Sequence, residues 1–444
     1  MHLGKKTVRC VIVVALTVMV VAACRQGGTD STDSGKEKVE LTWLVTSSPQ
    51  REPWHKEMVE KFQNEHPHIS INLQQIPYAD VDQKLQTLIA GGTPPDIWCP
   101  NWSQSGFPTF QAMDALLDLS PYIEKDPEVV EGIDDNLMEL YRVDGKYYGI
   151  PFQNYGSYLY YNKELFDKRG LDYPTTDWDD KSWSWDQMVE YAEKLTVTSE
   201  DINERTFGFM SNDETNKQAW LFGGDFFSAD DYANGEMETP QLLDNPKNVE
   251  AIQAHVDLIQ KGISPTPSQT EGLSEIGDPF ISGKVAMATN GGFAFINLKA
   301  ADFDWGVAAL PYVEGRQASL YTDPWSISAT SDHPDEAWEF LKYITDPEHG
   351  AKRYLEYTDA TPAHRGLLED WYRGIAEEAG MAYEEIKEVH EGSQRYGRGS
   401  DNHQIKQFSS IRRVIEQTMP AVYDGSMSVE EGFKVIEQGL LNLD

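Results

Sequence analysis

Two groups of polar residues directly follow predicted strands, which is where an α/β protein builds a binding site. The segment 47–50 (Ser-Ser-Pro-Gln) follows the alternating run 39–45, and the segment 100–103 (Pro-Asn-Trp-Ser) follows the apolar run 96–98. In a mainly parallel sheet, ligands bind beyond the carboxyl ends of the strands. The two segments are therefore expected to meet at the mouth of one site.

Aromatic residues are plentiful, with 12 Trp, 21 Tyr and 17 Phe in the chain. A sugar presents flat patches of C–H that pack on aromatic faces, so a sugar site needs such residues. Aromatic side chains also dominate the cores of ordinary domains. Composition alone does not separate these two interpretations.

A chain with a sugar site could be a sugar-binding protein. The main alternative class is a secreted carbohydrate-active enzyme, such as a glycoside hydrolase or a lyase. The carboxylate pairs Asp179–Asp180 and Asp230–Asp231 lie in polar, turn-like stretches, and an acidic chain produces such pairs by chance. The printed sequence contains no Gly-x-Ser-x-Gly elbow and no His-Glu-x-x-His helix. Segment 277–284 is one residue too long for a phosphate loop, and Val285 stands where Ser or Thr is required.

A binding protein for a non-sugar solute is the third class. Cys99 is the only cysteine outside the N-terminal region, and the ten His residues form no evident ligand set, so neither a metal nor another cofactor is expected. The formal net charge of −36 repels nucleic acid and disfavours anionic solutes on approach. Neither observation separates a sugar from an uncharged peptide.

The elements that must position the candidate residues follow from the apolar spacing. Alternation predicts strands at 39–45, 69–73 and 96–98, and helical periodicity predicts helices between them, the first ended by Pro67. This β-α-β-α-β order is the sign of a mainly parallel sheet in an α/β fold. Further strands are expected at 158–163, 206–210, 285–288 and 305–310, and further helices at 185–195, 249–261 and 335–344.

The N-terminus has the pattern of a secretory signal. Lys5, Lys6 and Arg9 precede an apolar run that is too short to span a membrane. Its end, Val-Ala-Ala-Cys at 21–24, resembles the lipobox of bacterial lipoproteins, which implies removal of residues 1–23 and lipidation of Cys24. Residues 24–38 are polar and predict a flexible tether. Removal of the three positive charges moves the net charge to about −39.

Several segments resemble, in order, the extracellular solute-binding proteins of carbohydrate ABC importers, the family that contains maltose-binding protein. The segments lie at 92–97 (Gly-Thr-Pro-Pro-Asp-Ile), 144–151 with 161–166, 280–291, 305–311 with 325–328, and 337–344. Each segment alone is a weak signal. Together they cover nearly all of the chain after the tether, which makes the resemblance specific.

The resemblance implies a periplasmic-binding-protein-like fold of the α/β class, with two lobes joined by crossing strands. Lobe 1 is expected to comprise residues 39–151 and 308–350, and lobe 2 residues 152–307 and 351–444. A saccharide is expected in the cleft between the lobes, and closure around it would create the shape that the permease of an ABC transporter recognises. The implied protein is a monomer outside the cytoplasm that binds without catalysis and touches the membrane only through its lipid anchor.

The resemblance also implies candidate ligand contacts. Ser48 and Gln50 follow the first strand, Tyr155 follows the first crossing, and Trp220 precedes a Gly-Gly-Asp turn. Trp102 and Phe293 offer aromatic faces for stacking, although relatives of maltose-binding protein commonly have Trp in place of Phe. The full expected set is Ser48, Gln50, Asn101, Trp102, Tyr155, Trp220, Asn290, Phe293, Asp323, Trp325 and Arg365. Trp220 as helix core and Arg365 as a surface ion pair remain open alternatives.

Overall fold

The computed structural model describes residues 37–199, 201 and 204–443. The predicted signal peptide, Cys24 and the tether up to residue 36 lie outside the described residues, so their processing and lipidation stay predictions. Lys38–Asp444 form one compact unit. Within the described ranges, no helix is both long enough and apolar enough to cross a membrane.

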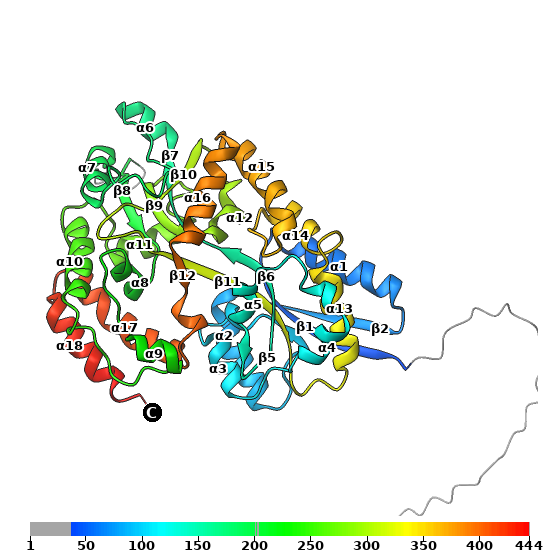
Figure 1. Ribbon diagram of the computed structural model, residues 1–444. Coiled ribbons are helices and arrows are strands. Elements are labelled where there is room, and N and C mark those ends of the chain that lie inside the picture. The colour runs from blue at the N-terminus through cyan, green and yellow to red at the C-terminus, as the bar shows by residue number, and fades with distance from the viewer. Residues whose placement is uncertain (1–36, 200, 202–203, 444) are drawn as a thin grey trace, which may run out of the picture. The chain divides into compact units, whose positions relative to one another are not determined.

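The first sheet contains the predicted parallel unit (Figure 1). Strand β1 pairs in parallel with β2 and β3, and β11 joins β3 in the antiparallel direction. The strand order is β12-β11-β3-β1-β2, and β6 also pairs with β11. The bounds are β1 (Val39–Thr46), β2 (Ile69–Ile76), β3 (Ile97–Trp98), β6 (Ile150–Tyr155), β11 (Ala318–Ile327) and β12 (Gly397–Gly399).

The second sheet has the order β10-β7-β9-β8. Strand β8 runs parallel to β9, whereas β7 runs antiparallel to both β9 and β10. The bounds are β7 (Ser157–Asn162), β8 (Phe207–Ser211), β9 (Val285–Gly291) and β10 (Trp305–Ala308). Only Gly156 separates β6 from β7, so the chain crosses there from the first sheet to the second. A small hairpin, β4 (Arg142–Val143) and β5 (Lys146–Tyr147), precedes that crossing.

Helices cover the first sheet and build its core. Helix α1 buries Trp54, Met58 and Phe62, which recur at helical spacing, and the Trp54 ring packs edge-on against Trp43 of β1. The bounds are α1 (Glu52–Glu65), α2 (Tyr78–Ala90), η1 (Pro100–Trp102), α3 (Gly106–Ala112), α4 (Ser120–Lys125), η2 (Pro127–Val129), α5 (Asp135–Glu139), α13 (Pro334–Thr345) and α14 (Ala351–Thr358).

A larger set of helices surrounds the second sheet. Several begin at capped residues; the Asn162 side chain, for example, accepts a hydrogen bond from the backbone N–H of Leu165. The bounds are α6 (Lys163–Arg169), α7 (Trp185–Leu195), α8 (Thr215–Trp220), α9 (Ala229–Asn234), α10 (Pro246–Gln260), α11 (Pro267–Ser274), η3 (Gly292–Ala294), α12 (Phe295–Leu298), η4 (Arg365–Leu367), α15 (Leu368–Ala379), α16 (Tyr383–Arg395), η5 (Asp401–His403), α17 (Phe408–Tyr423) and α18 (Val429–Leu440).

The boundary predicted at residue 350 between the two lobes stays a prediction. Helix α14 follows that boundary, yet it packs on α1 of the first sheet. Arg353 forms an ion pair with Glu57 at 3.0 Å, and the ring of Tyr354 lies 4.8 Å from that of Trp54. These contacts place α14 with the helices of the first sheet.

Candidate functional site

A cavity of about 460 Å³ lies where the two sheets approach each other. Its walls come from the loops after β1 and β3, from the crossing strands β6 and β11, and from helices around the second sheet. A volume of this size falls within the ~300–1,000 Å³ range of small-molecule sites. The lining residues are Thr46, Ser47, Ser48, Arg51, Tyr78, Asn101, Trp102, Gln104, Tyr155, Asn212, Glu214, Lys217, Phe293, Ile296, Asn297, Tyr321, Asp323, Asn402, His403 and Arg412.

Trp102 and Asp323 form the polar centre of the wall on the first-sheet side. The indole Nε1 of Trp102 donates a hydrogen bond to Asp323 Oδ2 at 2.9 Å, and the Arg51 guanidinium lies 5.5 Å from the Trp102 ring centroid. Burial raises the pKa of Asp323 to about 6, while the Trp102 hydrogen bond and the Arg51 charge act in the opposite direction. Above that pH the carboxylate is an oriented acceptor for ligand hydroxyl groups.

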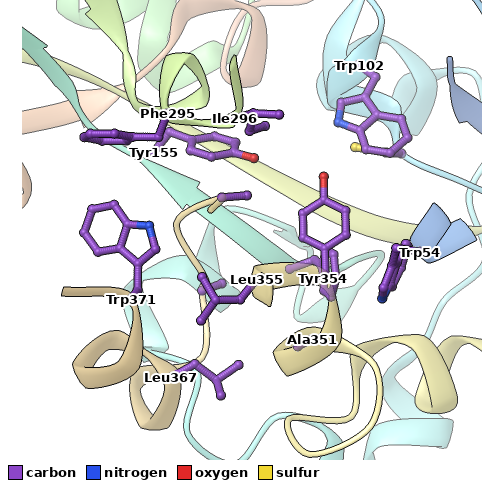
Figure 2. Packing of buried hydrophobic residues seen from close by; sticks show 14 of the residues in the cluster. Trp54, Trp102, Tyr155, Phe295, Ile296, Ala351, Tyr354, Leu355, Leu367 and Trp371 are labelled. Atoms are coloured by element: carbon purple, nitrogen blue, oxygen red, sulfur yellow. The ribbon is translucent and has the colours of Figure 1, made fainter. Parts of the chain in front are cut away.

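Arg51 and Tyr155 line the cavity, and Tyr354 lies close to Arg51. Arg51 Nη1 donates to Thr46 Oγ1 at 2.9 Å, but its Nε has no hydrogen-bond partner among the described residues. The hydroxyl ends of Tyr155 and Tyr354 point toward the same space, with the Trp102 indole nearby (Figure 2). Both hydroxyl groups are buried and unpartnered within the described chain. Buried polar groups without partners cost free energy, so a ligand that hydrogen-bonds to Tyr155 gains from this arrangement.

A charged cluster forms the wall on the second-sheet side. Glu214 pairs with Lys217 and also with Arg412 at 2.8 Å. The Lys217 Nζ lies 4.5 Å from the ring centroid of Tyr321. Burial opposes the charge of Lys217, but Glu214, Tyr321 and other neighbours outweigh it and raise the lysine pKa. Arg412 Nη1 also donates to Gln104 Oε1 at 2.5 Å, so this cluster connects the two sides of the cavity.

An exposed aromatic ring also lines the cavity. Phe293 is 38% exposed, and its ring meets Tyr155 at 6.1 Å and Tyr321 at 5.6 Å in edge-on geometry. Its neighbours fix the ring while leaving much of its surface open. Such a ring suits the apolar face of a small cyclic ligand.

Six of the eleven residues expected from the sequence line this cavity, namely Ser48, Asn101, Trp102, Tyr155, Phe293 and Asp323. Asn101 has little left to offer a ligand. Its amide donates to Tyr141 and to the Thr322 carbonyl, and it accepts from the Phe107 N–H. We therefore assign Asn101 a structural role in the cavity wall rather than a direct contact with the ligand.

Two of the expected tryptophans are core residues. Trp220 is 2% exposed, and the Arg398 guanidinium covers its ring at 3.7 Å. Trp325 is 1% exposed and packs between Trp43 and Trp102, at ring distances of 5.4 and 5.0 Å. Because neither ring is available to a ligand, we exclude both residues from the candidate site.

The other three expected residues are used elsewhere. Gln50 Oε1 accepts from the Ser48 hydroxyl at 3.0 Å, and Asn290 Oδ1 accepts from the next backbone N–H at 2.9 Å. Arg365 forms an exposed ion pair with Asp134 at 3.1 Å. None of the three lines the cavity.

Sequence reasoning missed most of the charged lining. Arg51 directly follows Gln50 in the loop after β1, so the strand-end argument could have included it. Glu214, Lys217, His403 and Arg412 come from α8, its preceding turn, η5 and α17. Glu214 follows the end of β8 by three residues, so the strand-end argument could have included it as well. The other three carry no such signal, and only tertiary packing brings them to the cavity.

Among the described residues, no cluster of three or more His, Cys, Asp or Glu side chains could hold a metal ion. Asp323 and Glu214 are the carboxylates of the cavity, and each is already engaged by donors or cations. The cavity therefore offers hydrogen-bond donors, acceptors and aromatic surface, which are the requirements for binding a polar, ring-shaped ligand.

Comparison with known proteins gives consistent matches. The family model of bacterial extracellular solute-binding proteins matches residues 47–351. The chain is 23% identical over 374 residues to the multiple sugar-binding protein of Streptococcus mutans, covering 81% of this chain and 82% of that protein. It is 24% identical over 368 residues to the galactooligosaccharide-binding protein of Bacillus subtilis, covering 80% of each.

A solved structure supports the same likeness. The ABC substrate-binding protein of Listeria monocytogenes in complex with cycloalternan superposes with a TM-score of 0.75 at 26% sequence identity. The superposition covers 91% of this chain and 98% of that chain. It confirms the α/β class and the periplasmic-binding-protein-like fold that the resemblance implied.

Proposed function

The chain belongs to the bacterial extracellular solute-binding protein family, and on that premise we propose that it captures a neutral saccharide and delivers it to an ABC importer. The observation that carries the proposal is the pairing of Asp323 with Trp102 beside the open ring of Phe293. A sugar needs both an acceptor for its hydroxyl groups and an apolar surface for its C–H face. Relatives named for multiple sugars, galactooligosaccharides and arabinooligosaccharides support this ligand class.

The proposed protein binds its sugar without changing it. Glycoside hydrolysis needs a carboxylic acid that donates a proton and a second free carboxylate. Asp323 has a raised pKa, but the other carboxylate of the cavity, Glu214, is paired with Lys217 and Arg412, which lower its pKa, so it is not a second free carboxylate. The names of the relatives as binding proteins support the same interpretation.

The proposed location is outside the cytoplasm, with Cys24 as a lipid anchor. The support is the lipobox-like segment 21–24 together with the polar stretch that follows it. Two or more acyl chains hold a protein at a membrane far better than one. The released sugar would then pass to the membrane-embedded permease, and the receptor itself would act as a monomer.

A thermal-shift screen of residues 25–444 tests the proposal. The panel contains maltose, galactobiose, arabinobiose and mannobiose, together with their longer homologues, glucuronate, dipeptides and zinc. A ligand that binds only the folded state raises the melting temperature with increasing saturation. We expect one neutral saccharide series to raise it and to be recovered unchanged. Consumption of the sugar would favour the enzyme alternative, and a shift only with peptides or zinc would reject the sugar assignment.

A further inference from the structure

A second cavity, of about 520 Å³, lies beside the one that contains Trp102 and Asp323. The two cavities share Asn212, Glu214 and Arg412, so the same three side chains line both. The second cavity is lined by residues from the end of β8 and from helices α8, α10, α11 and α17. It therefore adjoins the proposed sugar site and is built around the second sheet.

The three residues that line both cavities form the boundary between them, and the longest side chain among them is that of Arg412. Arg412 spans it, with Nη1 at 2.8 Å from Glu214 and Nε at 2.6 Å from Glu416. Arg412 is a long, half-buried side chain, and Asn212 is exposed. Rotation of such side chains is a fast motion that needs no change in the fold. Passage of a ligand longer than the first cavity therefore requires Arg412 to leave Glu214, Glu416 and Gln104, but no change in the fold.

The lining of the second cavity has both of the surfaces that a sugar unit requires. Ile259, Ile415 and Met419 supply apolar contacts on one side. On the other side, Asp213 is held by a hydrogen bond of 2.8 Å from Thr289 and presents a carboxylate acceptor. The cavity thus combines an apolar floor with a fixed polar edge, the usual composition of a small-molecule site.

The charges around the second cavity select against an anion. Asp213, Glu214, Glu271 and Glu416 line it, whereas Arg412 is its only Lys or Arg side chain. Burial lowers the pKa of His255 to about 4, so this histidine adds no positive charge at neutral pH. A uronate carboxylate would meet several like charges, whereas an uncharged sugar unit would not.

From the shared wall, the mixed lining and the acidic charge we propose that this second cavity holds the uncharged distal units of an oligosaccharide. The proximal units of the same molecule occupy the cavity of Trp102 and Asp323. This assignment rests on the proposed sugar-binding function and adds the ligand class: neutral oligosaccharides in preference to monosaccharides and disaccharides. Together the two cavities approach the upper end of the ~300–1,000 Å³ range of ligand sites.

The test blocks the second cavity and leaves the first intact. Thr270 lies half-buried on α11 and lines only the second cavity, so Thr270→Trp fills that space. Ser268→Trp places the same side chain at an exposed position of the same helix that lines neither cavity, and it serves as the matched control. Calorimetry then measures the affinities for malto-, galacto-, arabino- and manno-oligosaccharides of increasing length, each in the neutral form and with a terminal uronate.

In the parent protein we expect the affinity for one neutral series to rise about tenfold or more between the disaccharide and its longer homologues. Thr270→Trp should abolish this rise without weakening disaccharide binding, and Ser268→Trp should preserve it. The inference is overturned if long chains bind no tighter than disaccharides, if Thr270→Trp weakens short and long chains equally, or if a terminal uronate costs no affinity. If no saccharide of any length binds, the sugar function itself is rejected.

Discussion

Replacing Asp323 with Asn should stabilise the ligand-free protein and weaken sugar binding at the same time. Asp323 is buried against the cavity wall, which raises its pKa from 3.8 to about 6. A raised pKa means that the folded state binds the proton more tightly than the unfolded chain does. The stabilising contribution of Asp323 is therefore full below about pH 4 and is lost as the pH rises through about 6.

The magnitude follows from the size of that shift. At ~1.4 kcal/mol per pKa unit, the full shift corresponds to roughly 3 kcal/mol. Because the cavity admits water, we expect Asp323→Asn to raise the free energy of unfolding at pH 7 by only about 1–2 kcal/mol. For a chain of this length that equals a rise of roughly 1–3 °C in melting temperature. The neutral amide can still accept the Trp102 hydrogen bond, so the local packing should survive.

Binding should change in the opposite direction. A hydrogen bond from a sugar hydroxyl to a carboxylate contributes about 1.5–3 kcal/mol, so its loss should raise the Kd roughly 10- to 100-fold. Melting curves from pH 4 to pH 8, with calorimetric titration of the saccharide identified by the screen, measure both effects. Asp302→Asn, at an exposed aspartate, is the matched control and should change neither quantity. The reasoning is refuted if the stability difference of Asp323→Asn is independent of pH or if the affinity is unchanged.

Three further substitutions probe other parts of the site. Tyr155→Phe removes a buried, unpartnered hydroxyl group, so calorimetry should show several-fold weaker sugar binding while chemical denaturation shows unchanged or higher stability. In Gly106→Ala, the new Cβ would lie 1.7 Å from the Asn402 carbonyl oxygen, at a backbone φ of +70°. Because the two sides of the cavity could then no longer approach as closely, affinity should fall about tenfold, and parent-like affinity would contradict this contact. Arg365→Ala breaks an exposed ion pair and should change stability by less than about 0.5 kcal/mol and binding not at all; weaker sugar binding would return Arg365 to the site.

Much of the fold was predictable because its first three strands follow from patterns of neighbouring residues. The alternating run at 39–45 became β1 (Val39–Thr46), and the run at 69–73 became β2 (Ile69–Ile76). Strand β3 has only two residues, Ile97 and Trp98, yet the Pro-Pro-Asp turn before it identified its position. Periodicity and turn chemistry are properties of neighbouring residues, so a single sequence carries them.

The site was predictable only where it depends on strand ends. Ser48, Trp102 and Asp323 lie in or directly beside strands whose pairing the fold dictates, and all three line the cavity. Trp220 shows the limit of this reasoning. Its aromatic ring and its Gly-Gly-Asp neighbour suggested a stacking surface, but Arg398, far along the chain, covers that ring.

The charged wall of the cavity shows why contacts between residues far apart in the sequence were not predicted. Glu214 and Arg412 are almost two hundred residues apart in sequence, and each would be interpreted alone as a solvated surface charge. Their pairing arises because α17 packs beside α8, which depends on the burial of side chains throughout both helices. We therefore expect the charged wall, and the ligand preference that it imposes, to depend on the packing of helices around the second sheet. We expect altered side chains on α8, α11 or α17 to change that preference while the paired strands of the fold stay as they are.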